Sequence, residues 1–194
     1  MDRATVDEEL RIAKRKSAKS MLWVSLISMV MFFAGLTSAY VISMQRDDWV
    51  SFDLPNAFYT STIAILLSSI TLFLSHRFLK KGKLPISFLL LGITFILGIV
   101  FVILQYVGFN ELKSTGLFFT GPESTVSTSF IIGITFMHVI HIFAGIIVLL
   151  VVIYNHYKKK YSPADTLGFE LGAIFWHFVD VLWIYLFLFF YFIR

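Results

Sequence analysis

The stretch that decides the fold reads LPISFLLLGITFILGIVFVILQYVG and occupies residues 84–108. It runs for 25 residues without an acidic or a basic side chain. The hydrocarbon core of a bilayer is roughly 30 Å thick, and an α-helix of about 20 apolar residues crosses it. A run of this length therefore predicts a transmembrane helix rather than part of a water-soluble core.

Four further apolar runs reach a comparable length, so the sequence predicts an all-α, polytopic membrane bundle of five transmembrane helices. The expected spans are residues 21–44, 57–79, 84–108, 130–154 and 171–193. Charged residues make up only 14% of the chain, against about a quarter in soluble domains. We expect residues 1–20 to form a cytoplasmic N-terminal segment and residues 21–194 to form one five-helix domain. Thr5-Val6-Asp7-Glu8 fits a capping box, which predicts a short helix leading into the first span.

The distribution of basic residues predicts the orientation. Thirteen of the sixteen Lys and Arg residues precede the first span or lie in the second and fourth loops. Cytoplasmic loops of membrane proteins carry an excess of Lys and Arg. The N-terminus is therefore expected in the cytoplasm and the C-terminus outside. These loops account for the net charge of +4, and no nucleic-acid partner is needed to explain it.

Ionisable residues in the last two spans, or at their edge, are the candidate functional residues. They are His138, His141, Glu170, His177 and Asp180. Residues three or four apart lie on one helix face, and a charge at the bilayer centre costs at least about 2.5–3.5 kcal/mol on insertion scales. By depth, the two histidines of the fourth helix and the polar groups of the fifth reach similar levels. We therefore expect one polar cluster that joins the fourth and fifth helices.

Three interpretations of this cluster remain open. The favoured one is a buried hydrogen-bond network that fixes the register of the helices. Haem or metal ligation is a second, although His138 and His141 without a matching pair on a facing helix make a poor site for haem iron. A proton relay or a substrate path is the third, because intramembrane Asp, Glu and His often mark such paths. An independent small transporter or a haem-binding membrane protein therefore stays an alternative.

The fifth predicted helix carries Glu170 and, after five intervening residues, the sequence WHFVDVLW at residues 176–183. This pattern resembles the signature of subunit III of haem–copper respiratory oxidases, which include cytochrome c and quinol oxidases. The fourth predicted helix adds HVIH at residues 138–141 and Gly145, similar to the family's His-x-x-His-x-x-x-Gly. Met29 stands where the family has a buried Glu. The chain matches the last five of the family's seven helices, as in the short five-helix bacterial form.

The resemblance implies a non-catalytic subunit III of a proton-pumping terminal oxidase that reduces oxygen to water in a bacterial plasma membrane. Cytochrome c oxidase is the first expectation; a quinol oxidase subunit III or a nitric oxide reductase accessory subunit is the alternative. The family's catalytic subunit needs six His ligands, and its subunit II needs a Cys pair. This chain has five His and no Cys, so haem and copper are expected in partner subunits and not here.

The resemblance also implies the partners and the roles of the residues. The expected partners are subunit I directly, subunit II and the other subunits, membrane phospholipids and a larger respiratory supercomplex. The expected role is to stabilise subunit I, its lipids and its proton uptake. No catalytic residue and no metal ligand is expected. The structural polar network is expected at His138, His141, Glu170, Trp176, His177 and Asp180, with contacts to bound phospholipid at Glu170 and Trp183.

Overall fold

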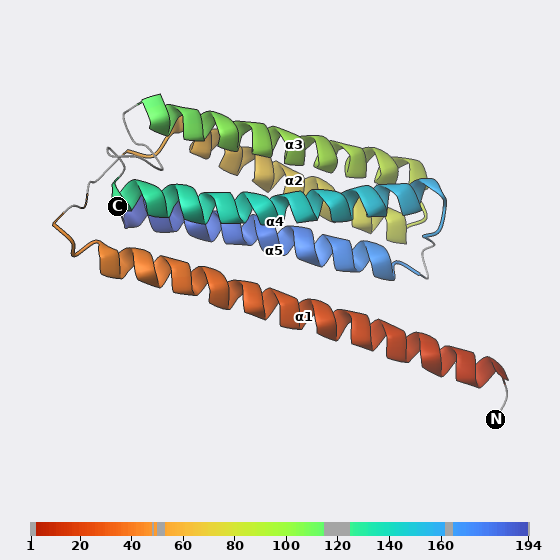
Figure 1. The fold of residues 1–194 in the computed structure, drawn as a ribbon. Helices are drawn as coiled ribbons and strands as arrows, with labels where there is room; N and C mark the ends of the chain where they lie inside the picture. The colour runs from red at the N-terminus through yellow and green to blue at the C-terminus, as the bar shows by residue number, and fades with distance from the viewer. Residues whose placement is uncertain (1–2, 48, 50–52, 115–124, 162–164, 194) are drawn as a thin grey trace.

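The computed structural model describes residues 3–47, 49, 53–114, 125–161 and 165–193. They form the helices α1 (Arg3–Ser43), α2 (Asn56–Lys80), α3 (Leu84–Ser114), α4 (Val126–Tyr157) and α5 (Leu167–Phe192). Each helix contains a segment long and apolar enough to cross a bilayer, which confirms the prediction of an all-α bundle with five helices of membrane-spanning length. Helices α2 to α5 pack side by side, and α1 runs along one side of them (Figure 1).

The helices extend past the apolar runs that predict them. α3 continues to Ser114 and α4 begins at Val126, because the hydrogen bonds of a helix are local and do not end where the apolar residues end. α1 is continuous from Arg3 to Ser43, without a break near residue 20. No Gly or Pro occurs between residues 3 and 34 to interrupt it. The helix expected ahead of the first span is present, but it begins at Arg3 and is continuous with the span, so Thr5 lies inside it and is not its N-cap.

Buried positions in each of the helices α2 to α5 include a series at alternating steps of three and four residues, and in α2, α4 and α5 some neighbouring positions are buried as well. In α3 the buried residues are Ser87, Leu91, Thr94, Gly98, Phe101, Gln105, Gly108 and Leu112. A repeat averaging 3.5 residues keeps one seam of a helix facing its neighbours in a left-handed bundle. His138 of α4 and Trp176 and Asp180 of α5 occupy the same kind of position. Their burial therefore follows from the register of the apolar residues around them.

A tight turn joins α2 to α3. Gly82 adopts φ of +72°, the left-handed conformation that glycine takes without strain after a helix C-terminus. Its amide donates to the Leu79 carbonyl at 3.0 Å, and the Lys83 amide donates to the Phe78 carbonyl at 3.0 Å. The turn lies at the same end of the bundle as the N-terminal half of α1 and the start of α5 (Figure 1). We call this end, which carries Lys19, Lys80 and Lys160, the basic end.

α1 packs against α4 and α5 and is the least buried of the helices. Only 22% of its most apolar window is buried, compared with 44% for α5. Its contacts are concentrated in the half away from the basic end, where Tyr40 is fully buried and packs edge-on against Phe189 and Phe190. The Thr37 and Tyr185 hydroxyls lie 2.9 Å apart. α1 thus presents a long apolar surface that no other part of the described chain covers.

Candidate interhelical polar site

Hydroxyl side chains of α2 bind the aromatic and polar side chains of α5 at two levels. Trp183 Nε1 donates to Thr62 Oγ1 at 3.0 Å, and Trp176 Nε1 donates to Ser68 Oγ at 3.0 Å. At the level of Trp176, Ser69 Oγ lies 2.6 Å from His177 Nδ1. Each contact satisfies a polar group that would otherwise be exposed to hydrocarbon. Together they hold α2 against α5.

Trp176 is the point where four helices meet. Its indole is 1% exposed and lies against two glycines, Gly98 of α3 and Gly145 of α4. A Cβ atom built on Gly98 would lie 2.7 Å from Trp176 Cη2, and one on Gly145 would lie 3.0 Å from Trp176 Cε3. Only a residue without a side chain lets the backbones of α3 and α4 come this close to the ring. The tryptophan therefore fixes the spacing of α2, α3, α4 and α5.

The two histidines of α4 face different neighbours. His138 is fully buried and stacks on Trp183 with ring centroids 5.2 Å apart, between the rings of Phe33 and Phe101. Neither of its ring nitrogens has a hydrogen-bond partner among the described residues. His141 points toward α1: its ring lies 5.6 Å from that of Phe33, and its Nδ1 lies 2.7 Å from the Met137 carbonyl of the preceding turn.

Asp180 is the buried acid of the site. It is 1% exposed and lies near the Ser69 hydroxyl, but neither carboxyl oxygen has a hydrogen-bond partner of acceptable geometry within the described ranges. His177 precedes it by three residues and shares the same serine. A hydroxyl of α2 therefore faces this acid, and no hydrogen bond joins the acid to a described residue of α4.

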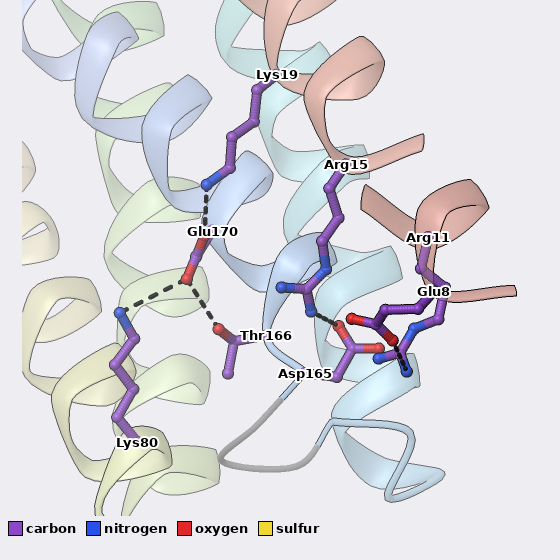
Figure 2. A network of polar contacts seen from close by, with 8 residues as sticks. All are labelled: Glu8, Arg11, Arg15, Lys19, Lys80, Asp165, Thr166 and Glu170. Carbon is purple, nitrogen blue, oxygen red and sulfur yellow. Dashed lines mark hydrogen bonds and ion pairs between the residues drawn. The ribbon is translucent and has the colours of Figure 1, made fainter. Parts of the chain in front are cut away.

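Glu170 occupies the first turn of α5 at the basic end, where it joins three helices. Lys19 of α1 lies 3.1 Å from Glu170 Oε2, and Lys80 of α2 lies 3.5 Å from Oε1. The Thr166 hydroxyl donates to Oε1 at 2.9 Å. Figure 2 shows the two lysines reaching the carboxylate from α1 and α2. An acid in the first turn also complements the helix dipole.

A second ion pair extends this contact along α1. Arg15 Nη2 lies 2.6 Å from Asp165 Oδ1, just before α5 begins (Figure 2). Partly exposed ion pairs contribute about 0–1 kcal/mol each. The two pairs therefore position α1 at the basic end without binding it tightly.

A further polar contact links α2, α3 and α4 near the same end. Ser75 Oγ donates to the Ser87 carbonyl at 2.7 Å, and His156 Nε2 lies 3.1 Å from Ser87 Oγ. All three residues are buried. His156 was not among the predicted site residues, since it falls at the end of its apolar run. The step of four residues from the buried Val152 places it on the interior seam.

The predicted single cluster between α4 and α5 is not what the structure shows. No hydrogen bond or ion pair joins any two of His138, His141, Glu170, His177 and Asp180, all of which the structure describes. Depth along a helix predicts the level of a side chain but not the direction in which it points. His177 and Asp180 turn toward α2, while His141 turns toward α1.

The predicted lipid contact at Trp183 is wrong, because this side chain is 0% exposed and lies inside the bundle. Glu170 keeps a quarter of its side chain exposed, and a lipid contact there stays a prediction. Reasoning from the sequence also missed the partners of Glu170. In the sequence, Lys19 and Lys80 serve only to predict the orientation of the chain. Their spacing from the apolar runs nevertheless places them at the same level as Glu170.

The described residues contain no group of three or more His, Asp, Glu or Cys side chains placed to hold a metal ion. The described polar groups of the interior are used chiefly for contacts between helices. Fold and site together define a multi-pass membrane helix bundle in which α5 is the central element.

Comparison with known proteins identifies the family. The family described as cytochrome c oxidase subunit III matches residues 3–194, and the chain belongs to that family. This confirms the resemblance found in the sequence.

Individual relatives cover different parts of the chain. The chain is 33% identical over 128 residues to cytochrome c oxidase subunit 3 of Pelomedusa subrufa, covering 66% of this chain and 47% of that protein. It is 31% identical over 173 residues to cytochrome c oxidase subunit 3 of Corynebacterium diphtheriae, covering 85% and 82%. It is 28% identical over 175 residues to cytochrome bo(3) ubiquinol oxidase subunit 3 of Buchnera aphidicola, covering 88% and 83%. It thus spans about half the length of the first of these relatives and most of the other two.

Proposed function

We propose that this chain is the non-catalytic subunit III of a proton-pumping haem–copper terminal oxidase, and that it stabilises subunit I, its lipids and its proton uptake. The observation that carries the proposal is the use of the family's α5 signature residues. Trp176, His177 and Trp183 direct their polar atoms to serines and a threonine of α2. Residues engaged in this way act as a rigid scaffold for a neighbouring subunit.

The proposed partners are subunit I, by direct contact, and subunit II and the other subunits of the complex. The apolar residues on the outer face of α1 support this assignment, for example Val24, Ile27 and Met31, each at least half exposed. A scaffold subunit needs such a surface for lipid or for a helix of another subunit. Haem and copper belong to the partners in this proposal, and bound phospholipid belongs to the interface.

The proposed location is a bacterial plasma membrane, with the basic end of the bundle in the cytoplasm. Lysines of α1, of the α2–α3 turn and of the α4–α5 connection gather at that end, as the positive-inside rule requires. The chain has no cysteine, so single cysteines report orientation directly. Ser17 of α1 and Ser114 at the other end of the bundle are both exposed. In intact cells, an impermeant maleimide should label Ser114→Cys and spare Ser17→Cys; the reverse pattern contradicts the orientation.

The function is tested by purifying the chain, with an affinity tag, from its native membranes in mild detergent. The proposal predicts that haem-containing and copper-containing subunits co-purify and that the complex consumes oxygen. A strain with the same tag on an unrelated membrane protein is the control. A chain that elutes without haem and supports no oxygen uptake contradicts the proposal.

The choice of electron donor distinguishes the two leading alternatives. The relatives include a cytochrome c oxidase subunit and a ubiquinol oxidase subunit, so the purified complex should be supplied with each donor separately. We propose cytochrome c as the donor. Oxygen uptake with ubiquinol alone would assign the chain to a quinol oxidase instead.

A further inference from the structure

His141 lies near the middle of the membrane, on the flank of α4 that faces α1. It comes fifteen residues after Val126, where α4 begins, and sixteen residues before Tyr157, where α4 ends. At 1.5 Å per residue, these distances are roughly 23–24 Å along a helix that is longer than the ~30 Å of hydrocarbon in a bilayer. Neither water nor a lipid headgroup satisfies a polar atom at this depth, so a protein group has to do so.

One ring nitrogen of His141 is bound, and the other is free. Nδ1 lies 2.7 Å from the carbonyl oxygen of Met137. A carbonyl only accepts hydrogen bonds, so Nδ1 carries the proton, and in the neutral ring Nε2 then holds a lone pair. Within the described part of the chain, Nε2 has no hydrogen-bond partner, and it is not one of the polar atoms that the protein encloses. Nε2 is therefore a hydrogen-bond acceptor at the surface of this chain.

The surroundings of His141 within the bundle are apolar. On the side of α1, the imidazole meets the phenyl ring of Phe33, with ring centroids 5.6 Å apart. A phenyl ring offers no N–H or O–H group, so this contact leaves the lone pair of Nε2 unused. His138, one turn earlier on α4, differs in this respect because it is fully buried among aromatic rings.

The residues of α4 beside His141 allow another helix to come close. Ala144 is exposed and follows His141 by three residues, which places it on the same side of the helix. Gly133 precedes His141 by eight residues, which is about 80° round the helix toward the same side as Ala144. No side chain or distant backbone atom lies within 4 Å of a Cβ built on Gly133. Small residues of this kind let the backbones of two membrane helices approach.

We propose that this surface of α4, consisting of Gly133, Met137, His141 and Ala144 and called here the His141 face, binds a transmembrane helix of a partner subunit. A side chain of that helix with an O–H or N–H group donates a hydrogen bond to His141 Nε2. This inference rests on the proposed function, because the partner is another subunit of the oxidase. It adds the face of the chain that is used and the chemistry of the group that meets it.

The chemistry of the face distinguishes this partner from lipid. An acyl chain covers apolar atoms equally well, but it has no group that donates to a lone pair at the centre of the bilayer. Contacts inside the bundle follow the chemistry proposed here, since Trp176 and Trp183 donate their N–H groups to hydroxyls of α2. The expected donor on the partner helix is therefore a Ser, Thr, Tyr or Trp side chain.

The test is a competition between variant and wild-type chains in the same cells. The two full-length chains are co-expressed, and the oxidase is purified through a tag on its haem-carrying subunit. Mass spectrometry then gives the ratio of the two chains in the oxidase relative to their ratio in the membrane. His141→Phe keeps an aromatic ring and removes the acceptor. His138→Phe makes the same change at a fully buried position of α4 and is the matched control.

A second pair of variants tests the close approach of the partner helix. Ala144→Leu adds bulk to the His141 face at an exposed position, where it leaves the packing of the bundle intact. Ala34→Leu adds the same bulk to an exposed position of α1, on the side of that helix where Thr37 reaches Tyr185 of α5. This pair keeps the test decisive even if His141→Phe folds poorly.

The proposal predicts that His141→Phe is depleted from the oxidase about three- to tenfold, the factor that one interhelical hydrogen bond in a membrane corresponds to. Ala144→Leu should be depleted as well, while His138→Phe and Ala34→Leu should be incorporated like the wild type. Incorporation of His141→Phe and Ala144→Leu at the level of their controls would overturn the inference and leave the proposed function standing. A wild-type chain that is missing from the haem-containing fraction would instead contradict the proposed function.

Nitrogen-15 NMR of the chain labelled at histidine observes the hydrogen bond itself. The resonance of His141 Nε2 is identified by its loss in His141→Phe. It should move toward the range of protonated nitrogens when the chain is part of the oxidase, compared with the isolated chain in detergent. An Nε2 resonance that is the same in both states would overturn the proposal, because lipid and not a donor would then cover the His141 face.

Discussion

The contact between Gly98 of α3 and the indole of Trp176 makes a sharp prediction about the packing of the bundle. A methyl group added at residue 98 would have its carbon 2.7 Å from Trp176 Cη2 and 3.0 Å from Cζ2. The ring cannot move away, because its Nε1 binds Ser68 and its other edge lies against Gly145. Overpacking of a closely packed core costs about 1–3 kcal/mol. We therefore expect Gly98→Ala to lower the free energy of unfolding by that amount.

Gly92 provides a matched control on the same helix. No side chain or distant backbone atom lies within 4 Å of a Cβ built there. Replacing a helical glycine by alanine favours the helix by up to about 1 kcal/mol, so Gly92→Ala should leave stability unchanged or raise it. Denaturant unfolding of the full-length chain in detergent micelles, followed by tryptophan fluorescence and circular dichroism, measures both variants.

A second substitution tests whether the indole is the cause. Trp176→Phe shortens the ring and should offset part of the cost of Gly98→Ala, so that the double variant is more stable than the sum of the two single changes predicts. Residues in direct contact commonly show coupling of about 0.5–3 kcal/mol. Equal stability of Gly98→Ala and Gly92→Ala, or strict additivity with Trp176→Phe, would refute the role assigned to this contact.

Three further predictions concern the polar side chains. Ser69→Ala removes the hydroxyl bound to His177. It should lower the free energy of unfolding by about 0.6 kcal/mol, the average for such contacts in membranes. If the effects of Ser69→Ala and His177→Gln are strictly additive in a double-mutant cycle, the contact is refuted. His138→Phe keeps the aromatic packing and removes two ring nitrogens that have no partner among the described residues. The free energy of unfolding, measured by thermal unfolding, should therefore change by no more than about 1 kcal/mol. A larger loss of stability would show that another group binds this imidazole. Glu170→Gln weakens the contacts with Lys19 and Lys80 by up to about 1 kcal/mol in total. It should increase the mobility of a spin label on the N-terminal part of α1, whereas the control variant Lys16→Gln should leave that mobility unchanged. Equal mobility of the label in both variants would argue against the contact.

The spans were predictable because apolar length is a local property of the sequence. The run at residues 84–108 alone implies a bilayer-spanning helix. The burial of His138 and Trp176 could also be predicted from the sequence, since both residues continue a series of apolar positions at alternating steps of three and four. Hydroxyl residues within an apolar run, such as Ser68 and Ser69 of α2, are typical of contacts between membrane helices, so their role is also readable from the sequence.

The pairing of the polar residues could not be predicted in this way. Whether His177 faces α2 or α4 depends on how α5 is rotated within the bundle, and that rotation is set by the packing of Trp176 against Gly98 and Gly145. The contacts of Glu170 with Lys19 and Lys80 depend on which helix ends lie together. Neither fact is contained in the depth of a residue along its own helix.

The central claim is that the buried acids and imidazoles of this chain support the structure while other subunits hold the redox centres. Haem and copper content per complex, measured by difference spectroscopy and elemental analysis in the purified oxidase with and without this chain, tests it most directly. The account predicts the same haem and copper content in both preparations, together with a shorter working lifetime when the chain is missing. Loss of a haem or a copper in step with loss of the chain would contradict it.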